Sequence, residues 1–223
     1  MKIYYAKIND IPATCSDTKV LLNLPAERLE RIQRMKNAQS RSQCIAAGLL
    51  LEYGLREQNM TSVGKTFGTY EGGKPYILEY PELYYNLSHS GIYVAAVMDD
   101  RPVGVDIECL RRDRQKLARR FFAEEEKAVL EQSWSDCVFT QMWTRKEAYL
   151  KAVGTGLRGA MDSFVVLDEQ VQVRRKRDAG GQQEERYYLK SFSVGEAGWC
   201  SVCRRDNRVE AELQYVDLMK EFL

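Results

Sequence analysis

The chain has 223 residues, of which 44% are hydrophobic and 29% charged, and its formal net charge is +1. This length is enough for one large or two small domains with a core that needs no disulfides. The near-zero charge excludes a strongly basic nucleic-acid binder by bulk electrostatics. Because no apolar run reaches the length of a signal peptide or a membrane span, we expect a cytoplasmic protein with neither nucleic acid nor membrane as a partner.

The six cysteines are scattered along the chain without the spacing of a disulfide framework. Cys200 and Cys203 form a lone C-x-x-C in a run that predicts a strand, with no second such pair and no histidine nearby. A structural zinc site needs four ligands. We therefore expect free structural thiols, as in a reducing compartment.

The first half of the chain alternates between strand and helix patterns. Residues 2–8 predict a strand, and the helical periodicity of residues 24–58 predicts two helices, because Asn37 offers a cap in the middle. A Gly-Gly-Lys-Pro turn at residues 72–75 leads into another strand. Residues 82–108 then predict three strands joined by turns.

The second half predicts a helical region over residues 113–153, with one helix beginning near Asp136. Two strands, 186–194 and 199–205, follow a polar loop at residues 176–185. Both halves carry paired tyrosines, a small-residue turn, an apolar strand and a charged end, in "LYYNLSHSGIYVAAVMDD" and "RYYLKSFSVGEAGWCSVCRRD". This weak echo suggests two similar α/β halves.

The stretch "GVDIE" places Asp106 and Glu108 on the same side of a short strand, about 6–7 Å apart. Two like charges at that separation repel, so the arrangement calls for a cation. We expect Gly104, just before them, to keep the entry of the strand clear for a substrate.

The stretch "MWTRKEAYLK" carries Trp143, Glu147 and Lys151 four residues apart, which places them on one stripe of a helix. Taken alone, the Glu147 and Lys151 spacing is also that of an ordinary helix-stabilising pair. Together with the two acids of the strand, Glu147 would complete a set of three hard oxygen ligands suited to Mg²⁺.

Two further stretches suit phosphate. The only histidine, His89, lies in a Ser-His-Ser-Gly turn whose hydroxyl and N–H groups can cradle a phosphate oxygen, although a lone histidine is more often structural. Lys74 follows two flexible glycines and can lie against an anion. With Mg²⁺ these groups favour phosphoryl-type transfer from a substrate that contains a pyrophosphate. The chain has no G-x-x-x-x-G-K-[ST] loop, which argues against an ordinary ATPase or GTPase.

In this order the segments "GGKPY", "YNLSHSG", "VGVDIE", "RRFFAEEE" and "WTRKEAYLK" resemble the 4′-phosphopantetheinyl transferases, in particular the monomeric type that activates peptide synthetases. The resemblance covers residues 1 to about 205. It implies an α+β fold of two similar two-layer α/β halves related by a pseudo-twofold axis, which we place at residues 1–101 and 102–223. The implied reaction moves the phosphopantetheine arm of coenzyme A to a serine of an apo acyl or peptidyl carrier protein, with release of adenosine 3′,5′-bisphosphate.

The resemblance also implies roles for single residues. Three acids would hold Mg²⁺, with Mn²⁺ as a substitute: Asp106, Glu108 and Glu147. Three residues would act in catalysis, namely Glu147 as the candidate base, Lys151 on the developing charge and His89 on the pyrophosphate. A water or Glu108 is the alternative base.

Coenzyme A would be held by residues of both halves. Those expected around the nucleotide and its phosphates are Gly73, Lys74, Ser88, His89 and Lys151. The 3′-phosphate would meet Arg28 and Arg31, which stand where the family has lysines, and Arg41 on the next helix, whose register is ambiguous by about two residues.

The sequence leaves two alternative functions open. The same acids would suit a Mg²⁺-dependent hydrolase of nucleotide pyrophosphates, and a non-catalytic module that binds coenzyme A or a carrier is a third reading. The pathway of the carrier, whether fatty-acid, polyketide or peptide synthesis, is not indicated. The basic stretch 111–120 with Phe121 and Phe122 is a candidate docking face for the carrier.

Overall fold

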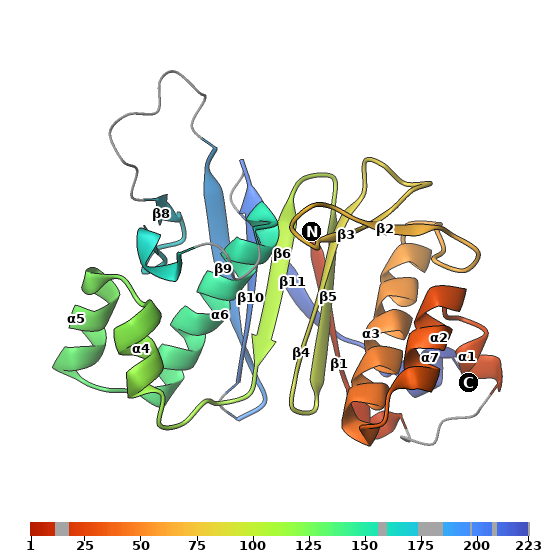
Figure 1. Cartoon of the computed structure of the whole chain (residues 1–223), viewed down its shortest axis with the longest axis horizontal. Helices are drawn as coiled ribbons and strands as arrows, with labels where there is room; N and C mark the ends of the chain where they lie inside the picture. The colour runs from red at the N-terminus through yellow and green to blue at the C-terminus, as the bar shows by residue number, and fades with distance from the viewer. Residues whose placement is uncertain (12–17, 156–159, 174–184, 197, 207–208, 223) are drawn as a thin grey trace.

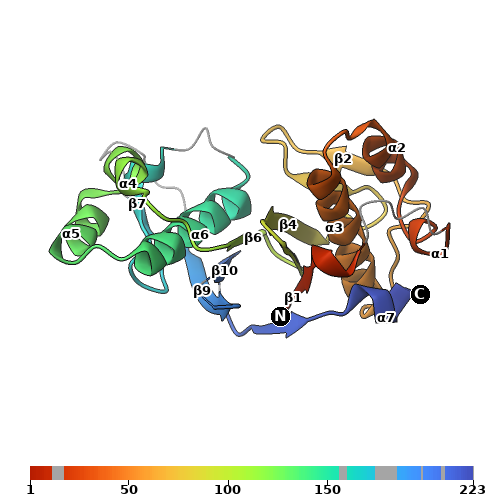
Figure 2. The ribbon, with the colours of Figure 1, turned by 90° about the horizontal axis from the view of Figure 1, so that it is seen from below.

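The computed structural model describes six stretches of the chain: residues 1–11, 18–155, 160–173, 185–196, 198–206 and 209–222. Two main sheets meet near the middle of the molecule, and one long helix covers the outer side of each (Figures 1 and 2). The first sheet has the order β11-β1-β5-β4, with strands at Glu212–Tyr215, Lys2–Lys7, Tyr93–Asp99 and Tyr84–Ser90. The second has the order β6-β10-β9, with strands at Val103–Glu108, Gly198–Arg205 and Tyr187–Val194.

Residues 24–58 contain two helices, as the sequence predicts: α2 (Ala26–Arg34) and α3 (Ala38–Arg56). Of the two, α3 is the one that packs on the first sheet. Asn37 caps α3, because its side-chain oxygen accepts a hydrogen bond of 2.8 Å from the backbone N–H of Ser40. Nearly every residue of α3 from Ser42 to Leu55 is buried, so this helix forms the centre of the N-terminal core.

The predicted helical region 113–153 contains three helices: α4 (Gln115–Phe121), α5 (Glu124–Gln132) and α6 (Asp136–Val153). The backbone is extended at Phe122 and Ala123, and again at Ser133 and Ser135, which interrupts the i to i+4 ladder. Ser135 caps α6 by accepting from the N–H of Val138 at 3.3 Å. The prediction that a helix begins near Asp136 is confirmed.

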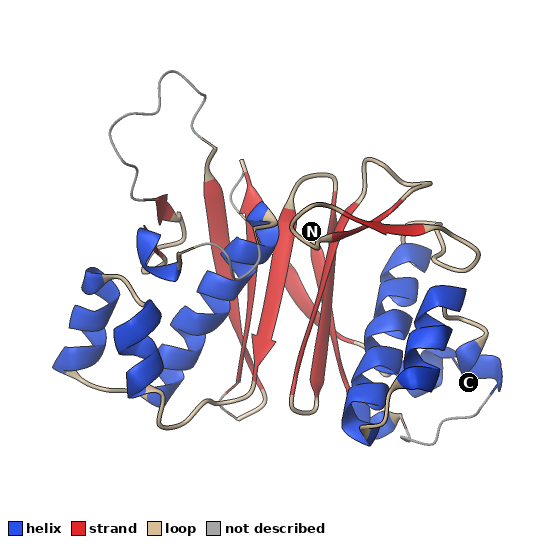
Figure 3. Cartoon of the chain, in the orientation of Figure 1, coloured by secondary structure: helices blue, strands red, loops and turns tan. Residues whose placement is uncertain are grey.

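The two halves repeat one topology (Figure 3). In the first, β1 pairs antiparallel with β5, and β5 with β4; in the second, β6 pairs antiparallel with β10, and β10 with β9. In each half the long helix comes between the first strand and the hairpin. The sequence echo falls on the two hairpins, β4–β5 and β9–β10, so the predicted mixed α+β fold with two similar halves is confirmed.

The end of the chain returns to the first half. Strand β11 pairs in parallel with β1, and helix α7 (Leu218–Phe222) packs into the core around α3. The division at residue 102 stays a prediction, and these last residues lie outside the half to which it assigns them. Most of the predicted loop 176–185 falls outside the described residues.

The remaining elements are short. They are η1 (Ile8–Asp10), α1 (Thr18–Leu21), β2 (Phe67–Thr69), β3 (Pro75–Ile77), η3 (Met161–Ser163), β7 (Phe164–Val165) and β8 (Gln172–Val173). Among the described residues, no helix combines the length and the apolar character needed to cross a membrane.

An apolar core between the two sheets holds the halves together. Its members include Val105 and Ile107 of β6, Val97 of β5 and Val202 of β10, all fully buried. Because side chains alternate along a strand, the acids of β6 point away from this core. Cys200 and Cys203 are free, buried thiols of β10.

Candidate active site

Asp106 lies on β6 with only 4% of its surface exposed. Its Oδ1 accepts hydrogen bonds from Ser88 Oγ at 2.7 Å and from Lys151 Nζ at 2.6 Å. Its Oδ2 is buried and has no hydrogen-bond partner among the described residues. Since buried polar atoms are nearly always paired in folded proteins, this oxygen is available for a ligand that the chain does not supply.

Glu108, two residues further along β6, is 7% exposed. One of its oxygens forms an ion pair with Arg111 Nη2, and the other accepts from the hydroxyl of Ser90. Burial raises the pKa of Glu108, and the hydrogen bond from Arg111 opposes that rise. The guanidinium of Arg111 also lies over the ring of Trp143, 5.6 Å from its centroid. Both oxygens of Glu108 are therefore engaged in this structure.

Glu147 and Lys151 come from α6, one turn apart, which confirms the predicted stripe. Burial raises the pKa of Glu147 to about 6, and the negative charges of Asp106 and Glu108 add to the rise, while Lys151 opposes it. The three carboxylates thus lie close enough to repel one another. This repulsion would be relieved by a cation.

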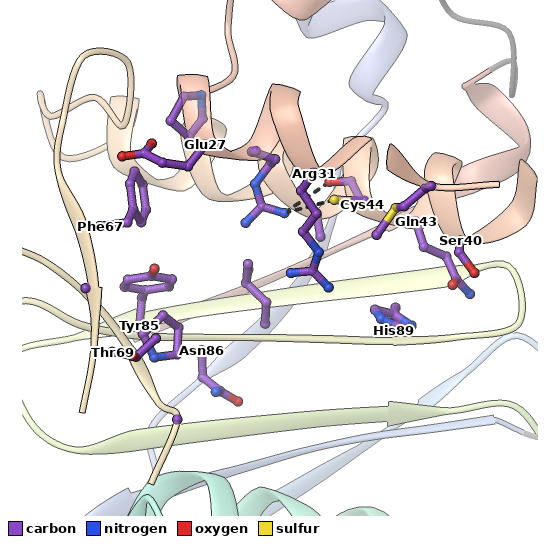
Figure 4. A pocket seen from close by; sticks show the side chains of 18 residues that line it. Glu27, Arg31, Ser40, Gln43, Cys44, Phe67, Thr69, Tyr85, Asn86 and His89 are labelled. Carbon is purple, nitrogen blue, oxygen red and sulfur yellow. Dashed lines mark hydrogen bonds between the residues drawn. The ribbon is translucent and has the colours of Figure 1, made fainter. Parts of the chain in front are cut away.

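A cavity of about 690 Å³ lies in the N-terminal half, and all of its lining residues fall between Pro25 and His89. Helices α2 and α3, strand β4 and the β2–β3 hairpin surround it (Figure 4). Arg28 and Arg31 line it from α2, and the rings of Phe67 and Tyr85 line it as well. Its volume is within the range of small-molecule sites. Two cations and two aromatic rings suit an anionic ligand that carries a flat group.

His89 connects the cavity to the acids. It lies on β4, lines the cavity beneath the side chain of Arg31 in Figure 4, and follows Ser88, the partner of Asp106. Partial burial lowers the pKa of His89, and the positive charges of Lys151 and Arg31 lower it further. The imidazole is therefore neutral at physiological pH and has a hydrogen-bonding nitrogen to offer to a ligand.

The predicted nucleotide residues separate into two groups. Gly73 lines the cavity with φ +81°, a conformation that favours glycine. Lys74 does not point its ammonium into the cavity; Nζ donates to the carbonyls of Val103 at 2.9 Å and Ala152 at 3.0 Å. Burial lowers the pKa of Lys74 to about 8. Its side chain ties the hairpin to the C-terminal half.

Arg41 likewise has a backbone partner, because its Nη2 donates to the carbonyl of Met35 at 2.7 Å. Met35 lines the cavity and Arg41 does not. Arg28 also donates to a backbone carbonyl, that of Cys44, at 3.1 Å, but its side chain faces the cavity. The structure therefore brings Arg28 and Arg31 together at the cavity and leaves Arg41 at its border.

The donor set fits a hard divalent cation. Within the part of the chain that the structure describes, no three His, Cys, Asp or Glu side chains are already grouped as a metal site. The unpaired oxygen of Asp106 and the mutual repulsion of the three acids nevertheless match what Mg²⁺ requires.

Comparisons with known proteins agree with this geometry. The model of the 4′-phosphopantetheinyl transferase superfamily matches residues 102–203, which include the acids and α6. A 4′-phosphopantetheinyl transferase of Bacillus subtilis named ffp is 32% identical over 171 residues, covering 74% of this chain and 76% of that protein. The chain belongs to this family. A second Bacillus subtilis 4′-phosphopantetheinyl transferase is 29% identical over 208 residues, covering 91% and 92%.

Three residues that contact the candidate site residues were not predicted. Asn86 and Ser90 flank Ser88 on β4, and Arg111 follows the acids of β6. A signal for the first two was present, because polar residues at every second position of "NLSHS" place three polar side chains on one face of a strand. Arg111 had no such signal, since it lies in a basic stretch that reads as solvated surface.

Two predictions about the transferase are wrong. Phe122 cannot contribute to a docking face, because it is fully buried and stacks on Phe139 at 5.3 Å between ring centroids. Gly104 does not clear space for a substrate: a Cβ there would lie 2.2 Å from the carbonyl oxygen of Ala148 in α6. The glycine lets the helix pack closely on β6 and so sets the distance between the acids and Glu147.

Proposed function

We propose that this member of the family transfers the 4′-phosphopantetheine arm of coenzyme A to a serine of an apo carrier protein and releases adenosine 3′,5′-bisphosphate. One observation carries the proposal. The buried carboxylate of Asp106 meets Ser88 and Lys151 beside a cavity lined by Arg28 and Arg31. A site for a cation and a site for an anion thus lie next to each other, as a magnesium-bound pyrophosphate needs.

The cavity would hold the nucleotide end of coenzyme A. Arg28 and Arg31 would neutralise its 3′-phosphate, since a guanidinium can donate two parallel hydrogen bonds to phosphate oxygens. The backbone around Gly73 and Lys74 would contact the base. Arg41 would contribute only after it releases the carbonyl of Met35.

Mg²⁺ would be held by Asp106, Glu108 and Glu147, with Mn²⁺ as a substitute. The cation would neutralise the pyrophosphate and orient it for attack. Oδ2 of Asp106 is available for it, whereas Glu108 would first exchange Arg111 for the cation.

The residues of the chain would then move one proton and stabilise one charge. The hydroxyl of the carrier serine is a weak nucleophile until a base accepts its proton. Glu147 would accept that proton, because it is a carboxylate one helical turn from Lys151 and close to the acids of β6. The serine oxygen forms a bond to the phosphorus that carries the pantetheine arm, the anhydride bond to the second phosphate breaks, and Lys151 and His89 stabilise the charge on the departing phosphate.

The partners follow from the reaction. We propose acyl or peptidyl carrier domains as the protein substrate, a monomeric enzyme and a cytoplasmic location. The family relationship does not select one carrier class, so a carrier from fatty-acid, polyketide and peptide synthesis each belongs in the assay.

The test is to incubate the protein with coenzyme A, Mg²⁺ and each apo carrier, and to weigh the carrier. A gain of one phosphopantetheine with release of adenosine 3′,5′-bisphosphate supports the proposal, and a chelator should abolish it. Release of the nucleotide without a carrier would indicate a hydrolase instead. Tight binding of coenzyme A without any turnover under Mg²⁺ would indicate a binding module.

A further inference from the structure

Strands β4 and β6 lie side by side but belong to different sheets. Side chains of β4 make hydrogen bonds to the backbone of β6 and of Cys109, the residue after it. From Asn86 on, every second residue of β4 accepts from a backbone N–H that lies 19 residues further along the chain. The three bonds are Asn86 Oδ1 from Val105 N at 2.9 Å, Ser88 Oγ from Ile107 N at 3.4 Å, and Ser90 Oγ from Cys109 N at 3.4 Å.

Ser88 and Ser90 also make a second hydrogen bond, which Asn86 does not make. Each donates its hydroxyl proton to the carboxylate that lies 18 residues further along the chain. Ser88 donates to Asp106 Oδ1 at 2.7 Å, and Ser90 donates to Glu108 Oε2. The same unit therefore occurs twice: one hydroxyl between an acid and the N–H of the next residue.

The hydrogen-bonding capacity of a hydroxyl makes this arrangement directional. A serine has one proton to donate and two lone pairs. When an N–H occupies a lone pair, the proton is free to point at the carboxylate. In Ser88 the hydroxyl proton and both lone pairs are used, because Oγ also accepts from Lys151 Nζ at 2.9 Å. For Ser90, Glu108 is the only acceptor within reach among the described residues.

We propose that Ser90 is a positioning residue for Glu108, as Ser88 is for Asp106. Its hydroxyl fixes the rotamer of the acid and sets which carboxylate oxygen faces Arg111 or, in its place, a divalent cation. The inference rests on the proposed function, since it assigns Glu108 to the cation. It also explains why a strand of the first half runs along the acids of the second: the halves are joined through the groups that orient the site.

The test compares Ser90→Ala with Ser90→Thr, which keeps the hydroxyl. Binding of Mn²⁺ in the presence of coenzyme A is measured by electron paramagnetic resonance. Residues that orient metal ligands typically contribute about 10–100-fold to metal affinity, so Ser90→Ala should bind Mn²⁺ that much more weakly and Ser90→Thr should recover most of the affinity. If Ser90→Ala does not fold, Ser90→Cys carries the comparison, because a thiol is only a weak donor.

Ser62→Ala is the matched control. Ser62 is fully buried and donates to Glu52 Oε2 at 2.6 Å, the same chemistry in a place that does not line the cavity. It should cost stability without changing Mn²⁺ affinity. A Ser90→Ala protein that binds Mn²⁺ within about twofold of the wild type would overturn the inference. A wild type that transfers nothing overturns the proposed function instead, so the two failures are distinct.

Discussion

Helix α6 carries two lysines that pair with carboxylates, and the two pairs differ in whether the chain supplies every hydrogen-bond partner. Lys146 pairs with Glu126 at 2.8 Å, and Lys151 pairs with Asp106 at 2.6 Å. In the first pair both side chains are fully buried, whereas 26% of the Lys151 side chain is exposed. The two lysines are five residues apart on the same helix, so what separates them is their surroundings.

In the first pair, both the carboxylate and the ammonium make further hydrogen bonds to the backbone. Glu126 accepts from the backbone N–H groups of Val166 and Ala123, both at 2.9 Å. Lys146 also donates to the carbonyls of Met161 at 2.7 Å and Phe164 at 2.9 Å. In the second pair, Oδ2 of Asp106 has no partner among the described residues. A buried ion pair whose partners are all supplied by the chain is structural, and one with an open oxygen is prepared for a ligand.

The largest expected effect on stability comes from breaking the pair between Lys146 and Glu126. Lys146→Met keeps the length of the side chain but leaves the buried charge of Glu126 without its counterion. Breaking a buried pair in this way costs about 3–5 kcal/mol, a large part of the stability of a domain. Urea unfolding measures it. A change below about 1 kcal/mol would show that this pair does not stabilise the folded protein.

The second prediction concerns the open pair. Asp106→Asn keeps the shape of the side chain and removes the charge that would hold the cation. Transfer of phosphopantetheine should fall by about 100-fold or more. The free energy of unfolding should change by no more than about 1 kcal/mol, because the repulsion among the three acids is also relieved. The carrier mass assay and urea unfolding are run on the same preparation, and loss of the fold would make Asp106 structural.

A smaller effect on stability tests the repulsion between Glu147 and the two acids of β6. Because the pKa of Glu147 is raised to about 6 from an ordinary 4.5, the folded state holds this proton more tightly than the unfolded state does. The ionised carboxylate therefore costs stability above pH 6, and the cost disappears as the pH falls through 6 towards 4.5. Glu147→Gln should raise the free energy of unfolding by about 2 kcal/mol at pH 8, since one pKa unit corresponds to about 1.4 kcal/mol, and leave it almost unchanged at pH 4. An equal change at both pH values would show that the effect is not electrostatic.

The smallest effect provides the baseline. Arg34 and Glu30 form an exposed i, i+4 pair at 3.1 Å, with 79% and 64% of their side chains exposed. Arg34→Gln should change the stability by no more than about 0.5 kcal/mol, since solvent screens such pairs. Thermal unfolding at low and high salt measures it. A cost as large as that of Lys146→Met would remove the contrast between buried and exposed pairs.

Much of the fold was predictable because its signals are local. Asn37 caps α3 and Ser135 caps α6, so both helix starts depend only on neighbouring residues, and the alternation of β6 places both acids on one face. The break at Phe122 was not predicted, because an apolar residue continues the helical pattern and its extended backbone is held by packing against Phe139.

The candidate site was predictable in its chemistry and less so in its contacts. The sequence placed Glu147 and Lys151 on one stripe of α6, and the need of the two β6 acids for a cation joined Glu147 to them. The sequence did not show that the ammonium of Lys74 reaches the carbonyl of Ala152, or that Glu108 holds Arg111. Long flexible side chains choose among partners that only the folded chain brings near.

By itself the sequence determined which residue types recur at the strand and helix periods, and therefore which side chains share a face: the two acids on β6, the three polar groups on β4 and the stripe of α6. The tertiary structure decided which faces meet. The approach of β4 to β6 gives each serine an acid, and the close packing of α6 over Gly104 brings Lys151 to Asp106. Periodicity is a property of one segment, whereas a hydrogen bond between segments depends on how both pack.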